Sequence, residues 1–123
     1  MACCRAAKVL HADKLVHRDL RLPNVVQLAP HQFMVIDLES VAAVTEPGLP
    51  KDFHHVLKTC TTEALDAARR FTAMSDMYLI GVLLEEAHQG FPAAAAENFI
   101  QKLMTKQLTA EEALAHLQHA WTV

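Results

Sequence analysis

The sequence predicts a mainly helical α+β fold, and two kinds of pattern point to it. Several segments repeat an apolar residue every three or four positions, which is the spacing of an amphipathic helix. Two β-rich runs of four residues, 25–28 and 33–36, lie between the first of these segments and the others. The resulting order of helix, strand pair, long loop and further helices is an α+β pattern.

The first half of the chain is expected to contain one helix and one hairpin. Residues 2–12 are predicted to be helical, and 15–16 form a short extended piece after them. Residues 29–32 join the two β-rich runs, so the pair is interpreted as a hairpin. Residues 40–62 are expected to be a long loop with at most one helical turn, because prolines and a glycine interrupt them.

Three helices are expected in the second half. Residues 74–88 are nearly all apolar, so this helix should be buried on most sides and should end before Gly90 and Pro92. Residues 93–105 form a second helix, and the last helix opens with a capping box at 109–112. Their apolar faces comprise Ala96, Phe99, Ile100 and Leu103 in one helix, and Ala113, Leu114, Leu117 and Trp121 in the other.

Length and composition favour a single globular domain over residues 1–123. The chain is 52% hydrophobic and 20% charged, with a net charge of -3. Nucleic-acid-binding surfaces usually show a basic excess, so no nucleic-acid partner is expected. The longest apolar stretch, 77–84, is too short for a membrane span, and no signal peptide is visible. We therefore expect a soluble, cytoplasmic protein.

Residues 17–26, His-Arg-Asp-Leu-Arg-Leu-Pro-Asn-Val-Val, carry the clearest chemical signal. Asp19 and Asn24 lie just before the predicted hairpin, and Asp37 lies just after it. Pairing of the two strands would return Asp37 close to Asn24, which gives two oxygen ligands for a hard divalent cation. Such a cation could bridge phosphates while Asp19 orients a hydroxyl group.

This stretch resembles the catalytic loop of protein kinases, whose signature is His-Arg-Asp-Leu-x-x-x-Asn. Four further blocks occur in the family's order and extend the resemblance over nearly the whole chain: 7–11 (the preceding helix), 35–39 (the Asp-Phe-Gly position), 75–85 (the long buried helix) and 108–116 (the closing helix). The resemblance implies a kinase-like large, or C-terminal, lobe with a small β-hairpin and no small lobe. Residues 39–64 would be its activation-segment-like loop.

The resemblance also implies the reactive groups. Asp19 matches the catalytic base, and Asn24 and Asp37 match the residues that hold Mg²⁺ beside ATP. Arg21 lies where many serine/threonine kinases have a lysine that touches the phosphate.

Three more residues match supporting positions of the family. His17 is expected to be a packed, hydrogen-bonded core histidine. Arg18 matches an arginine that often pairs with a phosphate on the activation loop. Asp76 matches a helix carboxylate that holds the catalytic loop by accepting its backbone N–H groups.

Several features depart from the family pattern. No Gly-rich phosphate loop, strand lysine or partner glutamate is expected before residue 11. Glu39 replaces a glycine and adds negative charge beside the metal site. Arg21, Pro23 and Glu39 also favour a relationship to aminoglycoside or choline phosphotransferases, so the substrate class stays open.

The leading hypothesis is a protein-kinase-like domain that is truncated and weak or inactive alone. Its ancestral chemistry is transfer of the ATP γ-phosphate to a protein hydroxyl with Mg²⁺. The alternatives are a non-catalytic, pseudokinase-type binding module, a fragment of a longer kinase, and a relative of the small-molecule phosphotransferases. Without the small lobe, an apolar face near Leu20, Val25 and Leu38 should favour self-association or a protein partner.

Overall fold

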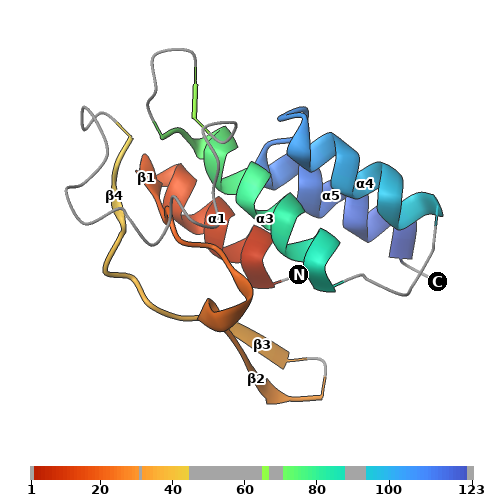
Figure 1. Cartoon of the computed structure of the whole chain (residues 1–123), viewed down its shortest axis with the longest axis horizontal. Coiled ribbons are helices and arrows are strands. Elements are labelled where there is room, and N and C mark those ends of the chain that lie inside the picture. The colour runs from red at the N-terminus through yellow and green to blue at the C-terminus, as the bar shows by residue number, and fades with distance from the viewer. Residues whose placement is uncertain (1, 31, 45–64, 67–70, 88–93, 122–123) are drawn as a thin grey trace.

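Four helices and two small antiparallel sheets make up the described part of the chain. The computed structural model describes residues 2–30, 32–44, 65–66, 71–87 and 94–121. The predicted mainly helical α+β fold is confirmed (Figure 1). The elements are α1 (Ala2–Ala12), β1 (Leu15–Val16), the 3₁₀ helix η1 (Leu22–Asn24), β2 (Val25–Ala29), β3 (Gln32–Val35), β4 (Ala42–Ala43), α3 (Ala73–Ala87), α4 (Ala94–Met104) and α5 (Ala110–Trp121).

Helix α3 forms the centre of the core. It lies between α1 and α4, and α5 packs against α1 (Figure 1). Every residue from Ser75 to Gly81 is buried, as the nearly continuous apolar sequence predicted. A Cβ atom at Gly81 would lie 2.7 Å from Met104 Cγ and 3.1 Å from Leu103 Cβ. Glycine at this position therefore allows α4 to approach α3 closely.

The N-terminus of α5 and the apolar faces of α4 and α5 agree with the sequence, and α4, predicted over 93–105, is described over Ala94–Met104. Thr109 and Glu112 form the predicted capping box, with Thr109 N donating to Glu112 Oε1 at 3.1 Å and Glu112 N donating to Thr109 Oγ1 at 3.2 Å. The apolar stripes contribute to the core through Phe99, Ile100, Leu103 and Ala113, with Leu114 and Leu117 packed against it. Gly90, Pro92 and the Trp121 side chain lie outside the described residues.

The hairpin is confirmed, and its strand bounds differ by one residue from the predicted runs 25–28 and 33–36 at three of the four ends. Val25 pairs with Val35 and Val26 pairs with Met34, and a β-bulge interrupts the register between Gln27 and Ala29. The bases of both strands, Val25 and Val35, pack against the hydrophobic core. The far end projects from the helical part of the molecule (Figure 1).

A second, smaller sheet was not predicted. Strand β1 pairs with β4 in antiparallel fashion, with Leu15 opposite Ala43 and Val16 opposite Ala42. The expectation of a loop across 40–62 is therefore wrong at 42–43. Two alanines give no strand signal, because alanine has low β propensity and the pairing is too short for a period of two. Residues 45–62 of that expected loop lie outside the described residues. None of the helices described is long and apolar enough to cross a membrane.

Candidate functional site

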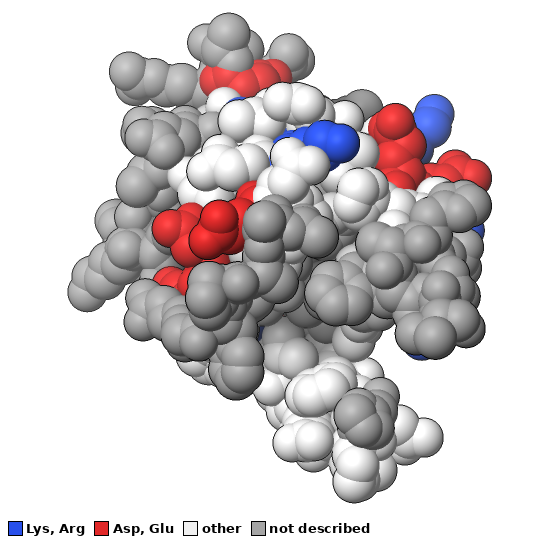
Figure 2. All heavy atoms as spheres, turned by 90° about the vertical axis from the view of Figure 1, so that its right-hand side faces the viewer, with Lys and Arg blue, Asp and Glu red and all other residues white. Residues whose placement is uncertain are grey.

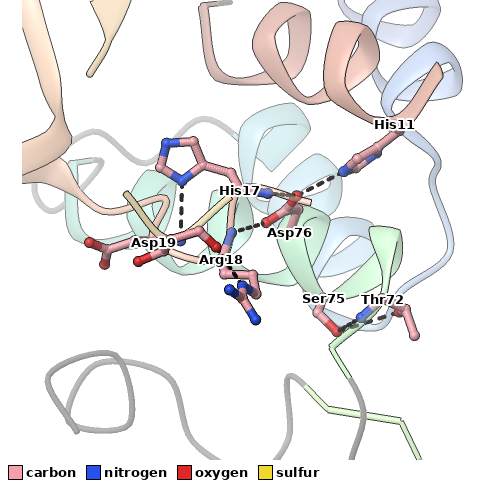
Figure 3. Close-up of polar contacts among 8 residues, drawn as sticks. His11, His17, Arg18, Asp19, Thr72, Ser75 and Asp76 are labelled. Atoms are coloured by element: carbon pink, nitrogen blue, oxygen red, sulfur yellow. Dashed lines mark hydrogen bonds and ion pairs between the residues drawn. The ribbon is translucent and has the colours of Figure 1, made fainter. Parts of the chain in front are cut away.

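The Asp76 carboxylate joins α3 to the segment that follows β1. Its Oδ2 accepts a hydrogen bond from His17 N at 2.8 Å, and its Oδ1 accepts one from Arg18 N at 2.9 Å (Figure 3). His11 Nε2, from the last turn of α1, lies 2.8 Å from the same Oδ2. Asp76 is fully buried, and a buried carboxylate is stable only when its oxygens are hydrogen-bonded in this way. One side chain thus connects three segments of the fold.

The N-terminus of α3 explains how Asp76 comes to this place. Thr72 precedes the helix, and its backbone N–H donates to Ser75 Oγ at 2.9 Å, while Ser75 N donates to Thr72 O at 2.9 Å (Figure 3). These bonds fix the first turn, in which Asp76 is the acidic residue. A carboxylate in the first turn is also favoured by the positive end of the helix dipole.

Arg18 adopts a conformation that is costly for a residue with a side chain. Its φ is 74°, in the left-handed region, which costs on the order of 1–3 kcal/mol. The backbone bond to Asp76 and a bond from Arg18 Nε to Ser40 O hold this conformation. Arg18 is buried at 7% exposure. The segment before Asp19 is therefore held from both sides, by α3 and by the chain leading into β4.

His17 supports the same turn from inside the core. It is fully buried, and its Nδ1 accepts a hydrogen bond from Asp19 N at 3.1 Å (Figure 3). Because Nδ1 is an acceptor, a neutral imidazole carries its proton on Nε2. Nε2 is itself buried and has no hydrogen-bond partner among the described residues.

Asp19 and Asn24 form the centre of the site. Asn24 Nδ2 donates to Asp19 Oδ2 at 2.9 Å and to Asp19 O at 2.8 Å. Both residues are buried, at 2% and 5% exposure. η1 fixes the position of Asn24, since Asn24 N donates to Arg21 O at 2.9 Å and Pro23 lies in the first turn. Neither side-chain bond uses the Asn24 amide oxygen, which is the atom suited to binding a cation.

Arg21 is a further hydrogen-bonding partner of Asp19. Its Nε donates to Asp19 Oδ1 at 2.9 Å. The Arg21 side chain is 34% exposed, whereas that of Asp19 is 2% exposed. The two carboxylate oxygens of Asp19 are therefore held by different groups, one by an amide and one by a guanidinium.

A backbone hydrogen bond keeps the segment that carries Asp37 next to Asn24. Ile36 N donates to Asn24 O at 2.8 Å, which extends the hairpin pairing toward Asp37. Asp37 has a φ of 63° and an exposed side chain. Its Oδ1 accepts a weak bond from Glu39 N at 3.4 Å. In the described ranges, no group of three or more His, Cys, Asp or Glu side chains could hold a metal. Convergence of Asp37 and Asn24 on a cation stays a prediction.

Sequence reasoning missed two contacts in this region. The His11–Asp76 contact joins residues 65 positions apart, and the Arg21–Asp19 ion pair holds the Asp19 carboxylate. The sequence carried no signal for the first, because it depends on how α1 packs against α3. The second depends on a rotamer that the sequence does not specify.

Comparison with known proteins shows what kind of chain this is. No family model matches it. Over 76% of its length it is 30% identical to cyclin-dependent kinase 20 of Rattus norvegicus. It is 34% identical over 77% of its length to a calcium and calcium/calmodulin-dependent serine/threonine-protein kinase of Lotus japonicus, and 30% identical over 81% to mitogen-activated protein kinase 15 of Caenorhabditis elegans. The chain is a protein-kinase-like segment.

The similarity covers only part of each relative. The matched region spans 28% of the Rattus kinase, 19% of the Lotus kinase and 24% of the Caenorhabditis kinase. The chain therefore corresponds to a fraction of those proteins, and their complete activities belong to longer polypeptides.

Proposed function

We propose that residues 1–123 form one domain, the large lobe of a protein-kinase-like phosphotransferase. Its ancestral chemistry is transfer of the ATP γ-phosphate to a protein hydroxyl. The arrangement around Asp19 carries this proposal. A buried carboxylate is oriented by Asn24 at 2.9 Å, at the end of a turn whose backbone is held by Asp76. Phosphoryl transfer depends mainly on such positioning, so rigidity at Asp19 is the property that the reaction needs.

In this proposal each polar group near Asp19 has a distinct role. Asp19 orients the substrate hydroxyl and accepts its proton as the oxygen attacks the γ-phosphorus. The bond from phosphorus to the bridging oxygen breaks, and ADP leaves. Arg21 bonds to Asp19 through Nε only, so its terminal guanidinium nitrogens can approach the transferred phosphate.

Oxygen ligands in this segment suit Mg²⁺. The Asn24 amide oxygen and the Asp37 carboxylate are hard donors, and Mg²⁺ is typically bound by one or two such groups together with substrate phosphates. When bound, the ion would neutralise charge on the phosphates. The backbone bond between Ile36 and Asn24, at 2.8 Å, supports the assignment because it keeps the two ligand-bearing segments adjacent.

The 123-residue polypeptide alone is proposed to be inactive or nearly so. Its three glycines are widely separated, at 48, 81 and 90, so these residues contain no Gly-rich phosphate loop. No segment matches the strand lysine that pairs with the α- and β-phosphates. Loss of one preorganised electrostatic group typically costs about 10²–10³ in rate, so two losses bring turnover close to background.

A non-catalytic binding module is the second candidate. Both carboxylate oxygens of Asp19 already accept hydrogen bonds, from Arg21 and Asn24, and a substrate hydroxyl must share or displace one of them. Exposed Glu39 would also repel phosphates at this edge. Arg21, Pro23 and Glu39 favour a third candidate, an ancestry among small-molecule phosphotransferases.

A metal titration tests the proposed roles of Asn24 and Asp37 directly. Titration of Mn²⁺ in the presence of a non-hydrolysable ATP analogue should broaden the amide resonances around Asn24 and Asp37. Asp37→Ala should abolish this broadening, whereas Asp13→Ala, which removes an exposed aspartate at the end of α1, should preserve it. Broadening that avoids both residues, or that survives Asp37→Ala, would contradict the proposed site.

A further inference from the structure

The hairpin β2–β3 presents an uncharged apolar surface to solvent. Residues 22–36 contain no Asp, Glu, Lys or Arg. Leu28, Phe33 and Met34 are 60%, 51% and 46% exposed. Figure 2 shows the result, since the lower projection of the molecule carries neither red nor blue atoms. A solvated antiparallel sheet normally shows polar residues on its outer face, so this surface is unusual for a hairpin that faces water.

In the part of the chain that the structure describes, no element covers the β2 edge of the hairpin extensively. Strand β3 packs against α1, whereas the only extensive packing of β2 among the described elements is with β3. Ile36 N donates to Asn24 O at 2.8 Å, so Asn24 and Ile36 form a hydrogen-bonded pair. Such pairs alternate with non-hydrogen-bonded pairs along an antiparallel ladder. Because Gln27 is three residues from Asn24 and lies opposite Phe33, its backbone N–H and C=O point away from β3.

Among the described residues, β2 carries no charged side chain and no proline, and no element other than β3 packs extensively against it. Exposed edge strands are normally blocked by lysine or other charged side chains, by proline, or by a covering element. The described bulge between Gln27 and Ala29 perturbs only the end of β2. A two-stranded hairpin is marginally stable alone, and three or more strands with an apolar face are more stable. Addition of strands to β2 would therefore stabilise the hairpin.

The geometry points to a second copy of this chain as the occupant of the β2 edge. We propose that two hairpins pair β2 to β2, antiparallel about a twofold axis, to form a four-stranded sheet. A twofold interface brings the same surface of both copies together. The whole chain has a net charge of -3, but residues 22–36 are neutral, so two copies meet here without like-charge repulsion.

This surface differs from the apolar face that the sequence suggested. Leu20 was expected near such a face, but it is 2% exposed and belongs to the core. Leu38 is 63% exposed. The most exposed apolar residues of the hairpin instead lie toward its tip, away from Asp19. Because each copy would contribute one five-residue strand, we expect the interface to bury less than the roughly 1,200 Å² of a standard stable complex, and we therefore expect a weak dimer with a micromolar or higher Kd.

Sedimentation velocity of the 123-residue chain over about a hundredfold concentration range tests the proposal. Wild type should shift from monomer to dimer. Leu28→Lys places charge on the apolar surface, and Gln27→Pro removes the outward N–H while leaving the β2–β3 bonds in place. Each should weaken association at least about tenfold. Val9→Lys is the matched control, because Val9 is an exposed apolar residue, at 67% exposure, that belongs to α1 and not to β2 or β3.

The folding of each variant is checked by circular dichroism, and only folded variants are compared. Leu28→Lys keeps the backbone unchanged and therefore remains informative if Gln27→Pro fails to fold. A wild-type chain that stays monomeric throughout would overturn the proposal. So would association that both hairpin variants leave unchanged, or that Val9→Lys weakens as strongly as they do.

Discussion

Asp76 Oδ1 accepts a hydrogen bond from Arg18 N at 2.9 Å, across 58 positions of sequence. This bond holds Arg18 at a φ of 74° and so sets the direction in which the chain enters Asp19. The other carboxylate oxygen accepts from His17 N and contacts His11. The central helix thereby determines the geometry of the candidate site directly, through one buried side chain.

Replacement of Asp76 should destabilise the protein strongly. Asp76→Ala leaves two buried backbone N–H groups without an acceptor, and each such group costs about 1–3 kcal/mol. Asp76→Asn keeps one acceptor oxygen and turns a donor toward the other N–H, so its effect should be smaller but still large. Glu85→Gln, at an exposed position of the same helix, should change stability by less than about 0.5 kcal/mol. Urea unfolding measures all three, and an Asp76→Ala effect as small as that of Glu85→Gln would refute the role of this carboxylate.

Two substitutions of Asn24 separate lost hydrogen bonds from added charge. Asn24→Ala removes two buried bonds to Asp19, each worth about 0.5–1.5 kcal/mol, or more for the bond to a charged oxygen. Asn24→Asp also places a second carboxylate where the amide nitrogen now lies 2.9 Å from Asp19 Oδ2. At neutral pH we therefore expect Asn24→Asp to be the less stable variant.

Lowering the pH should change the difference in stability between the two Asn24 variants in one direction. Protonation of one carboxyl removes the repulsion and restores a donor, so Asn24→Asp should recover stability relative to Asn24→Ala as pH falls. Gln27→Glu adds a carboxylate on exposed β2 and should show no such recovery. Denaturant midpoints at several pH values measure the effect. A gap between the two Asn24 variants that does not change with pH would contradict the account.

The two N-terminal thiols should be protected by folding. Burial raises the pKa of Cys3 from 9.0 to about 11 and that of Cys4 from 9.0 to about 12. Because the folded pKa values lie above the unfolded value, the neutral thiols favour the folded state fully below pH 9.0, and this contribution is lost as pH rises through the folded values.

Thiol chemistry checks this expectation in a Cys60→Ser background. Ellman's reagent should react slowly with the native chain at neutral pH and rapidly in denaturant, since the thiolate is the reactive form and both thiols are buried. Thermal unfolding should occur at lower temperature at pH 10 than at pH 8. Equal reaction rates for native and denatured protein would show that α1 does not bury these side chains.

Local patterns predicted most of the fold because each had a strong short-range cause. The capping box at Thr109 and Glu112, the apolar α3 and the two β-rich runs each specify an element within a few residues. β4 could not be predicted, since Ala42 and Ala43 become a strand only by pairing with β1. Long-range packing, not propensity, determines such elements.

In the candidate site, too, the sequence predicted the residues of local motifs but not the contacts that long-range packing determines. The sequence motif identified Asp19, Asn24 and Asp76, and the structure brings the first two into contact and places the third beneath the turn. The motif did not indicate that Arg21 would bind Asp19 or that His11 would contact Asp76. Both contacts depend on side-chain directions set by the assembled core. Binding of a cation by Asp37 also depends on ligands that the chain does not supply, such as substrate phosphates.

The most direct test of the proposed function is a radiolabelled ATP assay on the 123-residue chain with Mg²⁺ and generic protein substrates, run beside Asp19→Asn. We expect phosphate incorporation by wild type to be no higher than that of the variant. Asp19 is in place, but the 123-residue sequence contains no match to the lysine and the Gly-rich loop that bind the ATP phosphates. Robust incorporation by wild type that disappears in Asp19→Asn would contradict this expectation, and would show that this segment catalyses phosphoryl transfer by itself.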